Sequence, residues 1–254
     1  MRATTIGRKT IKLINAAVNI AAMTIAVLLL ALSGYALWDS EQLYQMADKS
    51  QYSVYKPTAK NQGKSFKELQ AINPDVIAWL TVYGTNVDYP VVQGRDNLHY
   101  ATTNVEGQYS ASGSIFLDYE NGSGFGDFAN ILYGHHMEKS AMFGDVGSFS
   151  AKDVFDSHRY GNLYYEGQNH GIEFICFAHT DAFDSSVFTV RVGEAERRAY
   201  LDNLFAKSIY TRDAGGAAED RLVLLSTCSS SSTNGRDILV GRITDAAYEN
   251  TFDK

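Results

Sequence analysis

The pattern of apolar and polar positions begins with one long apolar segment. No charged residue occurs from Leu13 to Trp38, and these 26 residues are enough to cross a bilayer as a helix. Apolar residues at helical spacing continue to about Lys56. The polar stretch that follows contains a proline and ends at Gly63, which predicts a linker.

Beyond the linker the pattern predicts one short helix and then many short strands. Ser65 and Glu68 have capping-box spacing, so we expect a helix that begins at Ser65 and stops before Pro74. Runs of β-branched and aromatic residues between turn residues then predict eight strands, at residues 76–82, 87–92, 114–118, 129–133, 162–165, 171–178, 221–227 and 237–243.

Two further helices are expected among these strands. One covers residues 142–149, although it contains glycines, and the other covers residues 193–207. In the second helix Leu201, Leu204 and Phe205 share one face. Many short strands with few helices indicate a closed or nearly closed β-barrel.

Charge is distributed unevenly along the chain. All four basic residues before the apolar segment lie within residues 2–12, and every acidic residue follows it, so the remainder, with 18 basic and 29 acidic residues, carries −11. The positive-inside rule then places the N-terminus in the cytoplasm and the rest outside the cell. The formal net charge of −7 argues against nucleic acid as a partner.

The apolar segment has two interpretations: it is a retained signal anchor or a cleaved signal peptide. Its length and the large residues Leu37 and Trp38 before Asp39 favour the anchor. We therefore expect a cytoplasmic tail (1–12), a membrane-spanning anchor (13–38), a helical stalk and linker (39–64) and an extracellular domain (65–254).

Cys228 is the first candidate for chemistry. It directly follows an apolar strand and precedes a polar, serine-rich loop, which places its thiol on a rigid element near solvent. A buried, inert thiol is the alternative. The only other cysteine, Cys176, lies within an apolar strand, and two cysteines do not make a disulfide framework or a structural zinc site.

His135 and His136 follow another apolar strand. A thiol is mostly protonated at neutral pH, so a cysteine nucleophile needs a basic partner such as histidine. Adjacent residues of an extended chain point to opposite faces, so at most one of the two rings can meet Cys228. A metal pair or a surface pair is the alternative, but no further ligands have zinc spacing.

Arg236 leads into the last strand, across a short loop from Cys228. It has two interpretations: it pairs with a carboxylate such as Asp237 or Asp220, or it donates to an oxyanion near Cys228. Spacing alone does not choose between them.

The local motifs resemble those of class B sortases from about Phe66 to the C-terminus. Leu225 to Cys228 resembles the active-site strand, Arg236 the catalytic arginine, and Tyr133-Gly134-His135 the Gly-His motif of that family. Further matching segments occur in the family's order at residues 73–80, 89–93, 96–97, 113–118, 134–137 and 142–144.

The resemblance implies a fold and an activity. The fold is a mainly β, eight-stranded sortase barrel with N-terminal helices and one helix before the cysteine strand. The activity is a cofactor-free cysteine transpeptidase of Gram-positive bacteria. It cuts a sorting signal like Asn-Pro-x-Thr-x after Thr, holds the surface protein as a thioester, and passes it to a peptidoglycan amine or a pilin lysine.

The same resemblance assigns roles to residues. Cys228 is the nucleophile, His135 the general acid/base and Arg236 the oxyanion or substrate clamp. The substrate-binding residues it implies are Ser226, Thr227, Asn97 and Ala101. Ala101 stands where relatives often carry a larger apolar residue, so we expect a wider groove there.

Two other functions use the same features. A membrane-anchored cysteine endopeptidase would need the same residues and would take water as the acceptor. A non-catalytic surface-binding module would keep Cys228 buried and inert.

Overall fold

The N-terminal part of the chain is a single helix. The computed structural model describes residues 2–58, 63–213, 218–229 and 233–252, and contacts divide them into one unit up to Gln45 and another from Met46 onward. Helix α1 (Arg2–Met46) carries the apolar segment, whose large side chains are exposed. Within the described residues it is the one helix with the length and composition to cross a membrane, a test that a signal sequence also meets. Part of the expected linker, residues 59–62, lies outside the described residues.

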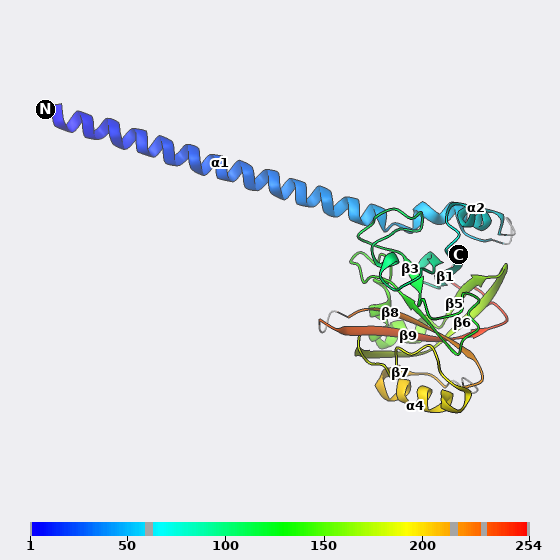
Figure 1. Cartoon of the computed structure of the whole chain (residues 1–254). Helices are drawn as coiled ribbons and strands as arrows, with labels where there is room; N and C mark the ends of the chain where they lie inside the picture. Colours follow the sequence, from blue (N-terminus) through cyan, green and yellow to red (C-terminus); the bar gives the residue numbers. More distant parts are fainter. Residues whose placement is uncertain (1, 59–62, 214–217, 230–232, 253–254) are drawn as a thin grey trace. The chain divides into compact units, whose positions relative to one another are not determined.

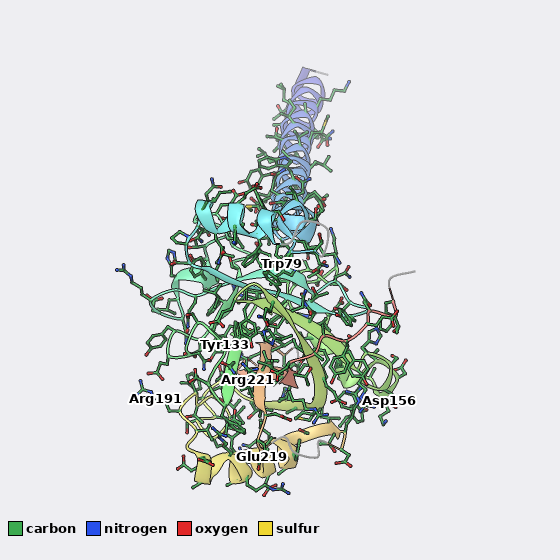
Figure 2. The ribbon with its side chains drawn as sticks, turned by 90° about the vertical axis from the view of Figure 1, so that its right-hand side faces the viewer. Trp79, Tyr133, Asp156, Arg191, Glu219 and Arg221 are labelled. Carbon is green, nitrogen blue, oxygen red and sulfur yellow. The ribbon has the colours of Figure 1, made fainter. Side chains whose placement is uncertain are left out.

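Two short helices precede the strands of the second unit. The 3₁₀ helix η1 (Lys49–Tyr55) is followed by α2 (Lys64–Ile72), whose Phe66 and Leu69 pack with the buried Trp79. Figure 2 shows Trp79 beneath this helix. The expected capping box is wrong, because Gly63, in a left-handed conformation at φ 71°, is the N-cap and makes no side-chain cap bond. Ser65 lies within the first turn instead.

Eight strands close into a barrel in the order β5-β1-β2-β3-β4-β8-β9-β6, with β6 pairing back to β5. This confirms the predicted eight-stranded sortase-type architecture. The short extra strand β7 (Ser208–Thr211) is hydrogen-bonded to β6 outside this closed ring (Figure 1). The barrel strands are β1 (Val76–Val82), β2 (Asp88–Val92), β3 (Ile115–Leu117), β4 (Ala129–Tyr133), β5 (Tyr160–Tyr165), β6 (Gln168–Asp181), β8 (Arg221–Cys228) and β9 (Gly235–Thr244).

The barrel strands are buried on both faces, which explains their nearly continuous apolar sequences. Alternate residues such as Leu80 and Leu225 fill the barrel interior. On the outer face, Leu224 belongs to a second cluster beneath helix α4 (Arg197–Lys207). Leu201 and Leu204 of α4 are buried in that cluster, as expected. The 3₁₀ helix η4 (Glu194–Glu196) leads into α4, so this helix lies between β6 and the cysteine strand.

The helix expected at residues 142–149 is largely wrong. Only the 3₁₀ helix η3 (Val146–Ser150) forms there, followed by the short helix α3 (Lys152–Ser157). Met142 has φ 51°, in the left-handed region, which does not fit a right-handed helix. The segment before η3 is a tight turn, in which a side chain on Gly144 would collide with the Met137 carbonyl at 2.2 Å.

Strand register brings the polar ends of three strands together. The parallel pairing of β4 with β8 sets Tyr133 beside Ser226. The antiparallel pairing of β8 with β9 sets Cys228 opposite Arg236. One end of the barrel therefore collects side chains that lie far apart in the sequence.

Candidate active site

A pocket of about 500 Å³ opens at this end of the barrel. It is lined by all seven residues that the sequence nominated, namely Asn97, Ala101, His135, Ser226, Thr227, Cys228 and Arg236. They come from the loop after β2, the end of β4 and the facing ends of β8 and β9. The roles assigned to them remain predictions.

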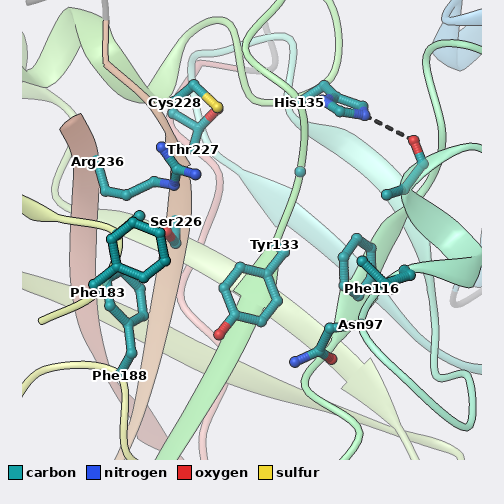
Figure 3. A pocket seen from close by; sticks show the side chains of 14 residues that line it. Asn97, Phe116, Tyr133, His135, Phe183, Phe188, Ser226, Thr227, Cys228 and Arg236 are labelled. Atoms are coloured by element: carbon teal, nitrogen blue, oxygen red, sulfur yellow. Dashed lines mark hydrogen bonds between the residues drawn. The ribbon is translucent and has the colours of Figure 1, made fainter. Parts of the chain in front are cut away.

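Cys228 ends β8 with an exposed side chain, as its position in the sequence predicted. In Figure 3 the guanidinium of Arg236 points toward it from the neighbouring strand. Nη1 of Arg236 donates to the carbonyl of Gly235 at 2.9 Å. The two acids proposed as alternative partners of Arg236 contact other side chains: Asp237 hydrogen-bonds with His179 at 3.0 Å, and Asp220 pairs with Arg242 at 3.4 Å. A positive charge that is not held by these acids thus lies beside the thiol.

His135 enters the pocket because Gly134 allows the chain to pass close to the buried Phe143. A Cβ on Gly134 would lie 2.7 Å from the Phe143 ring, so only glycine fits there. The Nε2 atom of His135 lies 2.7 Å from the main-chain oxygen of Ala101. His136 instead forms an isolated β-bridge with Met142 and is not among the pocket residues.

A hydrogen-bonded network forms the floor of the pocket. The Tyr133 hydroxyl and the Asn97 amide both donate to one carboxylate oxygen of the buried Asp118, at 3.0 and 2.8 Å. The Asn97 amide oxygen accepts the backbone N–H of Tyr119 at 3.0 Å. Burial, reinforced by Asp118, raises the pKa of Tyr133 far above its usual value. The phenol therefore stays protonated and acts as a fixed donor to Asp118.

Two buried hydroxyls lie next to the thiol along β8. Ser226 and Thr227 are almost fully buried, and neither side-chain oxygen has a hydrogen-bond partner among the described residues. A buried hydroxyl without a partner is costly. Both residues also line the pocket, so the cost of these buried hydroxyls falls at its edge.

Sequence reasoning missed the aromatic walls of the pocket. Phe116 and Phe188 flank the Tyr133 ring, with ring centroids 5.4 and 6.3 Å away, and Phe183 is a further wall residue although it is largely exposed. Tyr133 belonged to the quoted Tyr-Gly-His motif and could have been nominated from it. Phe183 and Phe188 lie between β6 and α4, where no motif marked them.

These groups suit acyl transfer by a thiol. An exposed thiol, an imidazole and a guanidinium share one pocket, and its apolar walls suit a bound peptide. Among the described residues, no group of three or more His, Cys, Asp or Glu side chains is placed to hold a metal ion.

Known proteins with the same fold identify the family. No protein-family model matches the chain. Sortase B of Listeria monocytogenes is 31% identical over 181 residues, which cover 70% of this chain and 73% of that protein.

Two solved structures are also similar. Sortase B from the type II pilus of Streptococcus pneumoniae is 44% identical with a TM-score of 0.62, over 71% of this chain and 99% of that one. A Streptococcus pyogenes class B sortase involved in pilus biogenesis is 42% identical with a TM-score of 0.66, over 72% and 99%.

The barrel, the pocket and these similarities define a cysteine transpeptidase. The chain belongs to the class B sortases.

The two cysteines should differ sharply in reactivity. Burial raises the pKa of Cys176 to about 12, so that thiol is protonated and inaccessible at neutral pH, whereas Cys228 is exposed. We expect iodoacetamide to modify the folded chain at Cys228 alone, as read by peptide mass spectrometry. Denatured protein, in which both thiols react, is the control. Equal labelling of Cys176 in the native protein would contradict the burial described here.

Proposed function

We propose that this sortase cleaves a C-terminal sorting signal of the Asn-Pro-x-Thr-x type after Thr and transfers the surface protein to an amine. The observation that carries the proposal is the meeting of Cys228, His135 and Arg236 in one pocket. Cys228 attacks the threonine carbonyl, His135 moves the proton, and Arg236 faces the developing oxyanion.

The same proposal assigns the peptide to the rest of the pocket. Ser226 and Thr227 line the pocket next to Cys228 and contact the peptide beside the reacting carbonyl. Asn97 and Ala101 line the opposite wall, where Asp118 fixes the Asn97 amide. The aromatic walls bury apolar surface of the signal.

The acceptor is the amine of a peptidoglycan cross-bridge or a lysine of a pilin. The Streptococcus pneumoniae sortase, which comes from a type II pilus, and the Streptococcus pyogenes sortase, which is involved in pilus biogenesis, are 44% and 42% identical to this chain. This similarity favours the pilin lysine. The apolar part of α1 supports retention as an anchor with the N-terminus in the cytoplasm and the catalytic unit outside, because four basic residues precede it.

An acceptor amine should raise turnover of a sorting-signal peptide by the detergent-solubilised full chain. The thioester on Cys228 is consumed only when a nucleophile attacks it. An added amine therefore speeds its breakdown and forms a new amide, which mass spectrometry detects. Glycine-terminated and lysine-containing acceptors, offered together, report the preference. The Cys228→Ala variant is the inactive control. If the rate does not depend on the amine and the only product is the free acid of the cleaved peptide, the enzyme is a hydrolase instead.

His135→Ala should cost about 10²–10⁴-fold in rate, the usual value of a general acid/base. His136→Ala should cost little, because that ring lies outside the pocket. Peptide cleavage by both variants, with melting temperatures as the folding check, makes the comparison. Similar losses in two well-folded variants would remove His135 from its proposed role.

Arg236→Lys keeps the charge but loses the fixed plane of guanidinium donors. Loss of one oxyanion donor typically costs about 10²–10³-fold, and we expect a fall of that order in kcat/KM. Lysine would instead replace a surface ion pair almost silently. A folded Lys variant with full activity would exclude Arg236 from catalysis and leave Cys228 and His135 as the only proposed catalytic residues.

A further inference from the structure

The hydrogen bond between His135 and the main chain of Ala101 determines where the ring carries its proton. Nε2 lies 2.7 Å from the carbonyl oxygen of Ala101. A carbonyl oxygen can only accept, so Nε2 must be the protonated nitrogen. In the neutral ring this leaves Nδ1 with a free lone pair.

We infer that the Ala101 carbonyl is the group that orients His135, and that Nδ1 is the atom that takes the proton of Cys228. The inference rests on the catalytic roles proposed above. In Figure 3 the hydrogen bond to Ala101 leaves the ring on the side away from Cys228. A thiol–imidazole pair generally needs a third group that orients the base, and here a main-chain oxygen occupies that place.

The proton balance follows from this assignment. The S–H bond of Cys228 breaks, its electron pair stays on sulfur, and the proton goes to Nδ1 of His135. Sulfur bonds to the threonine carbonyl carbon, the peptide C–N bond breaks, and the departing amine takes the proton from Nδ1. The acceptor amine then gives a proton to Nδ1 as it attacks the thioester, and sulfur leaves as a thiolate that recovers this proton. Nε2–H stays on the Ala101 carbonyl throughout.

Two carboxylates that adjoin or contact pocket residues are engaged with groups other than His135. Asp237 accepts from His179, and Asp118 accepts from Tyr133 and Asn97. The part of the chain that the structure describes gives the His135 ring one hydrogen bond, the bond to Ala101. The family resemblance placed Ala101 among the substrate-binding residues, and its small side chain predicted a wider groove. The structure shows in addition that its main-chain carbonyl accepts a hydrogen bond from His135.

The absence of a side chain on Gly113 leaves room for that carbonyl. Gly113 has φ 58°, and a Cβ there would lie 2.6 Å from the oxygens of both Ala101 and Tyr100. Backbone atoms cannot rotate away as side-chain tips do, so an added methyl group must shift the Ala101 carbonyl. Gly107, in the same connection between β2 and β3, has φ 83° and nothing within 4 Å of its Cβ position. Alanine at Gly107 carries the same kind of left-handed strain without the collision.

The test compares Gly113→Ala with Gly107→Ala in the detergent-solubilised full chain. The nitrogen resonances of labelled His135 report its tautomer, recorded in a Cys228→Ala background above the pH range in which histidine titrates. The spectrum of a His135→Ala variant assigns the signal. We expect Nε2–H in the parent and in Gly107→Ala, and a mixture of tautomers in Gly113→Ala. With Cys228 present, Gly113→Ala should lose kcat on the order of 10²-fold, and Gly107→Ala should keep it.

Two results would overturn the inference. One is an Nδ1–H tautomer in the parent protein. This measurement does not depend on whether either glycine variant folds. The other is a folded Gly113→Ala chain with the parent's nitrogen shifts and turnover. A failure of the proposed function gives a different result from a failure of this inference. In that case His135→Ala would stay active, while the parent protein would still show the Nε2–H tautomer.

Discussion

The register between β8 and its two neighbours is the constraint on which the site depends. Parallel pairing with β4 sets the level of Tyr133 and therefore of His135, and antiparallel pairing with β9 sets Arg236 opposite Cys228. A slip of one residue in either ladder would turn a whole strand's side chains to the opposite face. Leu225 packs in the barrel interior and Leu224 packs beneath α4, so a slip would break both sets of contacts. The packing of the core and the geometry of the active site therefore both require the same strand register.

The strands were predictable because their signal is local. Apolar, β-branched runs between turns marked all eight barrel strands, whereas the four-residue β7 carries Ser208 and Thr211 and is half exposed, so its sequence resembles a loop. The prediction of a helix at residues 142–149 was wrong because the conformation there is set by contacts that are distant in sequence. Its composition permitted a helix, but the left-handed conformation of Met142 and the close approach of Gly144 to Met137 come from tertiary packing, which no local pattern records.

The site was predictable to the extent that it lies at strand ends. Cys228, His135 and Arg236 each adjoin an apolar run, so position and family motifs both marked them. The supporting groups were not predictable in this way. Asp118 lies in the matching segment 113–118, but its contact with Tyr133 spans 15 residues and no local pattern revealed it. Phe188 lies in a connection that no motif marked, and a main-chain oxygen such as that of Ala101 leaves no signature in a sequence.

The separation of the two thiols has a consequence for oxidation. Cys176 lies opposite Val240 on β9 and Cys228 opposite Arg236, four positions apart, which is about 13 Å along the strand. A disulfide requires α-carbons within about 7 Å, so these two cysteines cannot form one in the folded chain. A sulfenic acid formed on Cys228 therefore has no internal thiol to resolve it. Recovery of the enzyme from oxidation must then depend on a reductant supplied from outside the protein.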